Sequence, residues 1–253
     1  VIYYGSNLPN NYEPYKTTIT NNGQLTVNGG IIETEGTGVA IRNKNELIIN
    51  DGIINALKVE NNKGSYCISN KGNATCTING GTLYCNGGSY NPVTCIRNFD
   101  NATIKMNGGS IIGAAPAIYN QSSRLSEDGI NEPAVYITGG TINVGSNYCA
   151  IQQTSIQSEV WIKQAENSEV LMQSRIDMQG KLIIDGGTFQ KEVTIGNAIK
   201  ISIKNAIMNE RLTIAYSNSE ILENEYEIVN SEIKSIFINS NGGLKIIDSK
   251  IGM

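Results

Sequence analysis

Short runs of alternating apolar and polar residues recur along the chain from residue 21 onward. In the first run Leu25, Val27 and Ile32 are apolar, and Thr26 and Asn28 are polar positions between them. A period of two predicts a β-strand with one buried face. Related runs follow at intervals of roughly 20 to 30 residues. They begin at Leu47, Cys76, Ile104, Val135, Leu182, Ile201, Tyr226 and Leu244, with a degenerate copy over residues 160–170.

A second block, with the form of "AIYN" at 117–120, recurs between these runs and usually ends in Asn. Two motifs that alternate about eight times predict a solenoid, in which each coil buries its apolar face only by stacking on its neighbours. We therefore predict an all-β, single-domain parallel β-helix of about ten coils over residues 21–253. Residues 1–20 lack the repeat, and we assign them to an N-terminal cap or lead-in segment.

The glycine pair of "TINGGTLYC", Gly80 and Gly81, resembles a phosphate-binding turn. Equivalent positions in other copies hold Asp-Gly, Asn-Ala, Asn-Ser or Asp-Ser, and the residues that follow again read as a strand and not as a helix. A phosphate cradle requires a helix N-terminus after the glycines. We interpret the pair as a turn or bulge that needs a small residue or one that tolerates a left-handed conformation.

The second block predicts an inward column of amides. If its Ile residues point inward, the residues two positions later do so as well. A buried amide must form hydrogen bonds, and Asn side chains stacked at the coil spacing can bond one another. We predict a structural ladder, continued by Gln153, whose members are Asn43, Asn70, Asn98 and Asn120.

The residues just before this ladder form an outward lane of Arg42, Ser69, Arg97, Tyr119 and Gln152. Arg and Tyr side chains on a rigid sheet can hold a glycan by hydrogen bonds and ring stacking, although the lane can also be an ordinary solvated surface. Four candidate ligand-binding residues follow: Arg42, Arg97, Tyr119 and Gln152. Strict alternation also predicts a second outward lane, of small residues: Ala40, Cys67, Cys95, Ala117 and Ala150. Cys67 and Cys95 are neighbours in this lane, and the sequence leaves open whether they form a disulfide.

Two insertions, at residues 86–92 and 121–133, interrupt the repeats. Insertions in solenoids lie at turns and often carry function. They add four candidate ligand-binding residues: Tyr90, Arg124, Glu127 and Asp128. We predict no cofactor and no metal ligand set, with Ca²⁺ at the longer insertion as the open alternative.

Composition removes several classes of function. The 253 residues include no His, so His-based catalysis and His metal sites are excluded. The net charge of −4 disfavours nucleic acid as a partner. The five cysteines form no CxxC motif, and no apolar run is long enough for membrane insertion. The start at Val1 suggests a segment of a longer precursor, and after Met253 we expect either further coils or a covering partner.

The alternation of "INGGTL" and "AIYN" segments resembles the right-handed parallel β-helix of the pectate-lyase-like superfamily. More narrowly, it resembles repeat regions of surface adhesins of low-GC Gram-positive bacteria. The resemblance implies a right-handed coil, an extracellular location on a bacterial cell surface and a monomeric domain of a larger protein. Polysaccharide lyases and phage tail proteins share this architecture, so function must be argued from sites.

We expect a non-enzymatic adhesin or carbohydrate-binding domain that presents its outward strand faces and loops to a polysaccharide, host glycan or host surface protein. The alternative is a polysaccharide lyase or glycoside hydrolase that uses Lys105, Arg97 and nearby acids. The outward lanes lack the paired carboxylates such enzymes use, which disfavours catalysis. A further alternative is a segment of a phage or tailocin fibre, which would be a trimer.

Overall fold

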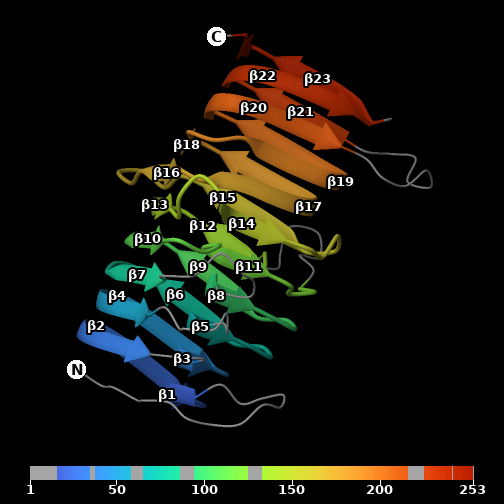
Figure 1. Cartoon of the computed structure of the whole chain (residues 1–253). Helices are drawn as coiled ribbons and strands as arrows, with labels where there is room; N and C mark the ends of the chain where they lie inside the picture. Colours follow the sequence, from blue (N-terminus) through green and yellow to red (C-terminus); the bar gives the residue numbers. More distant parts are fainter. Residues whose placement is uncertain are drawn as a thin grey trace.

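The computed structural model describes residues 16–34, 38–57, 65–85, 94–124, 133–215, 225–240 and 242–252. Over these residues the chain forms strands and turns and contains no helix. Every strand pairing in the sheet is parallel, and each strand pairs with the one that occupies the same place in the next repeat. Figure 1 shows the resulting stack of coils, with the described N-terminal strand at one end and the C-terminal strand at the other.

The strand pairings form three stacks, which we call faces A, B and C, with ten segments in each. Six strands bend around a corner and contribute to two faces: β2 (Gln24–Thr34), β4 (Glu46–Ala56), β17 (Arg175–Asp185), β19 (Val193–Lys204), β20 (Ile207–Ala215) and β22 (Glu232–Asn239).

The remaining strands each lie on one face. Face A begins with β1 (Lys16–Asn21), β3 (Gly38–Asn43), β5 (Tyr66–Asn70), β8 (Thr94–Asn98), β11 (Ile118–Asn120) and β14 (Cys149–Gln153). It continues with segments of β17, β19, β20 and β22. Face B begins with segments of β2 and β4, followed by β6 (Thr75–Ile78), β9 (Thr103–Met106), β12 (Val135–Ile137) and β15 (Glu159–Lys163). It continues with segments of β17 and β19 and ends with β21 (Glu225–Val229) and β23 (Gly243–Ile247). Face C begins with segments of β2 and β4, followed by β7 (Thr82–Cys85), β10 (Ser110–Gly113), β13 (Gly140–Asn143), β16 (Val170–Met172) and β18 (Thr188–Phe189). It continues with segments of β20 and β22 and ends with β24 (Lys250–Ile251).

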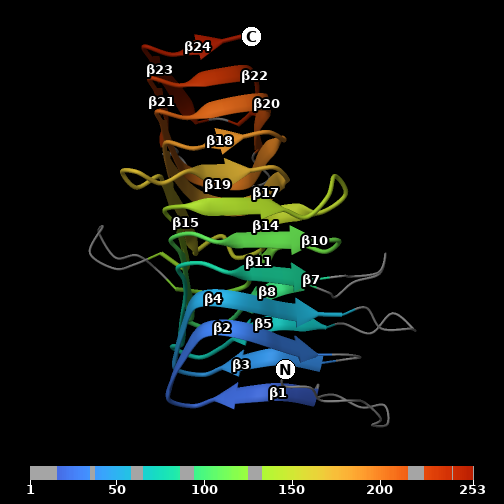
Figure 2. The ribbon, with the colours of Figure 1, turned by 90° about the vertical axis from the view of Figure 1, so that its left-hand side faces the viewer.

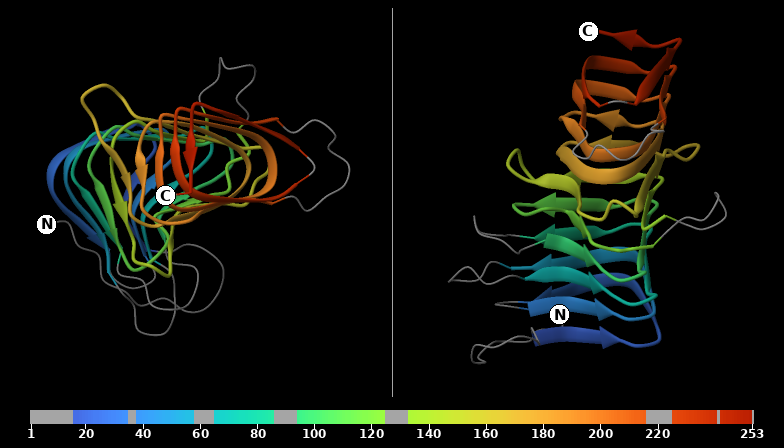
Figure 3. Two further views of the ribbon diagram at one scale, coloured as in Figure 1. Left: turned by 90° about the horizontal axis from the view of Figure 1, so that it is seen from above. Right: turned by 90° about the vertical axis from the view of Figure 1, so that its right-hand side faces the viewer.

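The chain runs from face A to B to C in each repeat and rises by one coil as it returns to A. Seen from the side, the strands of one face are stacked and point the same way (Figure 2), and the view from above shows overlapping coils that are progressively shifted from the N-terminal to the C-terminal end (Figure 3). The sense of the rise in these views is right-handed. The prediction of a right-handed parallel β-helix of about ten coils is confirmed.

The described coils begin earlier than the repeats in the sequence suggested. Lys16–Asn21 forms β1 and pairs in register with β3, from Lys16 opposite Gly38 to Asn21 opposite Asn43. Residues 16–20, which the repeat pattern assigns to the lead-in segment, therefore belong to the first coil. The rest of the expected cap lies outside the described residues.

The core consists of stacked columns of inward aliphatic side chains. Ile41, Ile68, Ile96, Ile118 and Ile151 are fully buried in successive coils of face A. Burying one such side chain contributes roughly 1.5–3 kcal/mol. The alternation of period two in the sequence therefore corresponds to real burial, and it fixes the register of the stack.

The Asn ladder is confirmed, with its members stacked in the order that the repeats predict. The Nδ2 groups of Asn43, Asn70 and Asn98 each donate to the Oδ1 of the next Asn in the stack, at 2.8, 2.9 and 2.8 Å. Asn21 precedes them, and Asn120 donates to Gln153 Oε1 at 2.8 Å. The first four Asn side chains also donate to backbone carbonyls at the corner between faces A and B, as Asn70 does to Thr103 O at 2.9 Å, and Asn120 donates to Ser158 Oγ at 3.1 Å. The buried amides are therefore satisfied by one another and by the turns that they hold.

The glycine pair forms the turn that we predicted between faces B and C. Gly81 has a φ of 75°, and a Cβ on it would lie 2.6 Å from the carbonyl oxygen of Gly52 in the preceding coil. In the later copies without glycine the positive φ lies one position earlier in the turn, at Asn205, Asn230 and Asp248, with φ values of 53°, 46° and 46°. Asn and Asp tolerate this region better than other residues with a side chain, which explains the substitution pattern.

One sequence prediction is wrong: the lane of small residues points inward. Ala40, Cys67, Cys95, Ala117 and Ala150 are all fully buried. The pairing passes from Val39 opposite Tyr66 to Ile41 opposite Ile68, so the start of the strand breaks the alternation. The chain turns here from face C onto face A, and Cys67 Sγ lies 3.3 Å from the carbonyl oxygens of Ile54 and Tyr84 on face C. Two successive residues can therefore face the core at this corner.

The same corner holds the one disulfide among the described residues. Cys95 bonds to Cys85 at the end of β7, and not to Cys67 in the neighbouring coil. Cys67, Cys76 and Cys149 are free and buried. The disulfide links faces C and A across the turn that joins them.

Candidate functional site

The outward side of face A carries two columns that flank the buried ladder. Each ladder Asn points inward, so the residues directly before and after it point outward. The column before the ladder contains Arg42, Ser69 and Arg97, which lie opposite one another in the register of β3, β5 and β8. The column after it contains Lys44, Lys71, Phe99 and Gln121, because the N–H of each bonds to the carbonyl of the ladder Asn one coil earlier.

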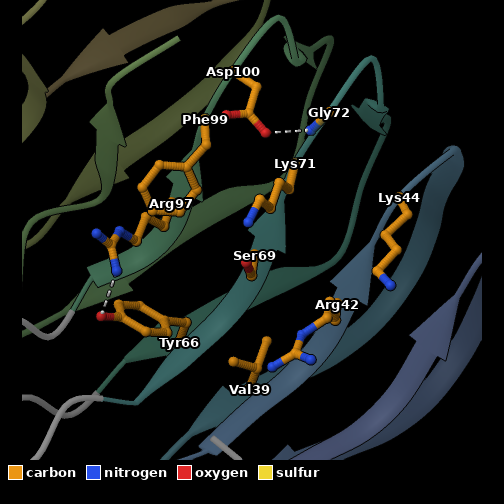
Figure 4. A pocket seen from close by; sticks show the side chains of 10 residues that line it. All are labelled: Val39, Arg42, Lys44, Tyr66, Ser69, Lys71, Gly72, Arg97, Phe99 and Asp100. Atoms are coloured by element: carbon orange, nitrogen blue, oxygen red, sulfur yellow. Dashed lines mark hydrogen bonds between the residues drawn. The ribbon is translucent and has the colours of Figure 1, made fainter. Parts of the chain in front are cut away.

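These columns enclose a groove of ≈ 570 Å³ over the second, third and fourth coils. Its lining includes the buried side chains of Val39 and Tyr66 and the half-buried Ser69. Figure 4 shows the side chains of Arg42, Lys71 and Arg97 around Ser69, with Lys44 and Phe99 further along the groove. The volume lies within the roughly 300–1,000 Å³ of small-ligand sites.

Arg97 is held by the groove on several sides. Its guanidinium carbon lies 4.0 Å from the centroid of the Phe99 ring and 5.6 Å from that of Tyr66. Nη1 donates to the Tyr66 hydroxyl at 3.3 Å, and Nη2 donates to Gln121 Oε1 at 3.4 Å. The Nε atom is buried and has no hydrogen-bond partner. The guanidinium is therefore fixed in orientation, and part of its donor capacity is not used.

The groove carries four cationic side chains and one carboxylate. Lys44 and Lys71 are exposed, Arg42 and Arg97 are half-buried, and the carboxylate belongs to Asp100. Asp100 Oδ2 accepts the backbone N–H of Gly72 at 3.1 Å, and Asp100 has a φ of 55°. The carboxylate thus bonds to the turn of the preceding coil and forms no ion pair with a described residue.

The eight residues that the sequence singled out are partly brought together. Arg42 and Arg97 both line the groove. Tyr119 and Gln152 follow in the same outward lane, in register with Arg97, but lie beyond the groove. Arg124 Nη1 donates to Asn101 O at 3.3 Å. Three candidates lie outside the described residues: Tyr90, Glu127 and Asp128.

Sequence reasoning missed seven groove residues: Val39, Lys44, Tyr66, Lys71, Gly72, Phe99 and Asp100. The signal for the column after the ladder was present. The triplets "RNK", "SNK" and "RNF" at 42–44, 69–71 and 97–99 each place an inward Asn between two outward side chains. Tyr66 has no comparable signal, because it stands where the alternation is broken.

Face B carries a separate aromatic cluster. Tyr136 and Trp161 lie in register on β12 and β15, with ring centroids 5.9 Å apart in an edge-to-face arrangement. Lys163 Nζ lies 3.7 Å from the centroid of the Trp161 ring, and the indole N–H is buried without a hydrogen-bond partner. Lys163 therefore covers the ring surface to which a ligand would stack.

The residues of the enzymatic alternative do not converge. Lys105 lies on β9 of face B, in register with Tyr136, whereas Arg97 lies on β8 of face A. Over the described part of the chain, no group of three or more Cys, Asp or Glu residues is placed to hold a metal ion. The described residues also include no helix that is long and apolar enough to cross a membrane. A comparison of the chain with protein-family models, curated proteins and solved structures finds no match.

Proposed function

We propose that this chain is a non-enzymatic, extracellular β-helix that binds a glycan in the groove of face A, as part of a bacterial surface adhesin. The observation that carries the proposal is the groove itself. It combines a rigid parallel sheet with the hydroxyl of Ser69, the ammonium groups of two lysines and the guanidinium groups of Arg42 and Arg97. Saccharides present many hydroxyl groups, and fixed donors on a rigid sheet bind them with little loss of protein entropy.

The repeat pattern gives independent support. It resembles the repeats of large surface proteins of Gram-positive bacteria, and it implies a right-handed coil of the kind found in the pectate-lyase-like superfamily. A stack of coils is a rigid rod, and a groove across several coils presents its ligand contacts on a continuous surface. Presentation of such a surface to a polysaccharide, a host glycan or a host surface protein requires no catalytic residue.

Two assays on the same preparation test this proposal. A glycan array gives the binding specificity, and incubation with the glycans that bind gives turnover, measured as new reducing ends and as ultraviolet absorbance of unsaturated products. We expect binding without turnover, and a monomeric mass in light scattering. Turnover of a bound glycan would establish the enzyme instead, and a trimeric mass would favour the fibre.

A variant locates the binding site. Arg97→Ala removes the guanidinium that Tyr66, Phe99 and Gln121 hold, and we expect it to weaken glycan binding. The matched control is Arg211→Ala, which removes an exposed arginine that pairs with Glu192 at 2.8 Å elsewhere on the rod. Equal binding by the two variants would show that the glycan binds outside the groove.

A further inference from the structure

We propose that the groove selects anionic glycans, whose carboxylate, sulfate or phosphate groups contact Arg42, Lys44, Lys71 and Arg97. This inference rests on the proposed function and names its ligand class. The whole chain has a net charge of −4, yet the groove contains four cationic side chains and a single carboxylate. A cleft lined by one sign of charge raises the local concentration of oppositely charged ligands, whatever the net charge of the protein.

The basic side chains of the groove differ from those elsewhere on the rod. On the later coils Lys204 pairs with Glu227 at 3.3 Å, Arg211 with Glu192 at 2.8 Å and Lys234 with Glu210 at 3.1 Å. In each case the acid lies within one coil of the base. In the groove, neither Arg42 nor Lys44 nor Lys71 forms an ion pair with any described residue. Their charges are therefore available to a ligand.

The stacking of the coils places like charges beside each other. The N–H of Lys44 bonds to Asn21 O and that of Lys71 to Asn43 O, so the two lysines occupy one column in adjacent coils. Strands in a sheet lie about 4.8 Å apart, and like charges directly opposite destabilise a sheet. An anion bound between the lysine column and the column of Arg42 and Arg97 would relieve the repulsion between the two lysines. The lysines would therefore bind the anion more strongly than their exposed positions suggest.

Arg97 adds a hydrogen-bond donor group of fixed orientation to the cationic groove. Its guanidinium is packed 4.0 Å from the Phe99 ring and bonded to Tyr66 and Gln121. A guanidinium that is already ordered loses little entropy when it binds a planar carboxylate or an oxyanion. Asp100 forms no ion pair with Arg97, and its carboxylate instead accepts the backbone N–H of Gly72 (Figure 4).

The aromatic rings of the groove disfavour single-stranded nucleic acid as the anion. Proteins that bind it combine positive charge with open rings on which bases stack. Here Tyr66 is only 2% exposed, and Arg97 packs against the Phe99 ring. Apart from the Phe99 ring, against which Arg97 packs, the accessible lining consists mainly of charged side chains and the Ser69 hydroxyl, which suits a saccharide with acidic substituents better than a base.

The experiment uses three polymers with one backbone: neutral dextran, carboxymethyl dextran and dextran sulfate of the same length. Binding is measured by titration calorimetry at several salt concentrations. We expect no binding of dextran, and salt-sensitive binding of one or both charged polymers. The two charged polymers distinguish carboxylate from sulfate, and competition with sodium phosphate tests a phosphate ligand. A single-stranded oligonucleotide that binds better than either polymer would overturn the proposal in favour of nucleic acid.

Two charge-matched variants separate groove binding from general electrostatic attraction. Lys71→Glu reverses a charge inside the groove, and we expect it to weaken binding of the charged polymer about ten-fold or more. Lys200→Glu makes the same change in net charge at an exposed lysine on face B, opposite Glu225, and should leave binding within about two-fold. Equal losses in both variants would refute the groove as the anion site. Circular dichroism of both variants verifies that they fold.

The outcomes for the two proposals differ. If the protein binds neutral glycans on an array, loses this binding with Arg97→Ala and binds charged polymers no more tightly than neutral ones, the glycan-binding proposal stands and the anion selectivity is overturned. Absence of binding to all neutral and anionic glycans would overturn both.

Discussion

The guanidinium carbon of Arg97 lies 4.0 Å from the centroid of the Phe99 ring, two residues further along the chain. The buried Asn98 lies between them and points into the core, so its two neighbours emerge on the same outer surface. The ladder that closes the inside of each coil thus also sets the spacing of the groove on its outside.

Phe99→Leu should weaken binding of the charged dextran about two- to five-fold, because a cation–π contact contributes about 0.5–1 kcal/mol at an exposed site. The charge of the groove is unchanged, so the loss would report on the order of the guanidinium alone. Phe237→Leu is the matched control, since Phe237 is 52% exposed on β22, far along the rod from the groove. Unchanged affinity in the Phe99 variant would show that the ring does not organise Arg97.

Asn70→Ala should lower the free energy of unfolding by about 2 kcal/mol or more. Asn70 is fully buried, and its loss leaves Asn43 Nδ2, Asn98 Oδ1 and the Thr103 carbonyl each without one hydrogen bond. The measurement is urea denaturation followed by circular dichroism.

The control for this variant lies in a second ladder on the surface. Asn79 donates to Asn50 Oδ1 at 2.9 Å and accepts from Asn107 at 2.9 Å, but it is exposed to water. Asn79→Ala should therefore cost less than about 0.5 kcal/mol, because water replaces both bonds. If the two variants are equally unstable, burial is not what makes the inner ladder important.

Gly81→Ala should destabilise the fold by about 1–3 kcal/mol. Gly81 has a φ of 75°, and an added Cβ would lie 2.6 Å from Gly52 O, a backbone atom of the preceding coil that can move only with its strand. Gly23→Ala is a matched control at another turn, where a Cβ meets no heavy atom within 4 Å. Thermal unfolding should place the Gly23 variant close to the unmodified protein, and a similar loss in both would point to glycine itself and not to the left-handed turn.

The free energy of unfolding should fall as the pH rises above about 9. Burial raises the pKa of the Cys67 thiol and that of the Cys76 thiol from 9.0 to about 12. Between these values the unfolded state loses protons that the folded state keeps, so stability that is present below pH 9 is lost by up to about 1.4 kcal/mol per pH unit for each thiol.

Urea denaturation between pH 8 and pH 10.5 measures this slope. Other groups titrate in the same range, so the informative quantity is the difference from the double variant Cys67→Ala, Cys76→Ala. The double variant should be less stable at pH 8 but should lose stability less steeply with pH. Parallel slopes in the two proteins would contradict the assignment of the pH dependence to these thiols.

The sequence by itself determined the coil. Alternation of period two specifies which side chains are buried, and repetition at intervals of one coil specifies which residues lie beside each other, so Asn70 had to meet Asn98. Both inferences depend only on local geometry and on stacking, which the order of residues encodes directly. The outward placement of Arg42 and Arg97 followed in the same way.

The tertiary structure decided what happens at the corners. Where the chain turns from face C onto face A, the space beneath the neighbouring face accepts two successive side chains, and Cys67 is buried although alternation places it outside. The pairing of Cys95 with Cys85 also depends on the path of that turn. The groove brings side chains of three coils together around Ser69, and its shape and charge depend on distances between residues that are remote in sequence. The repeats place each groove residue in its column, but they give only the direction of each side chain and not the curvature of the backbone, which sets the shape of the groove.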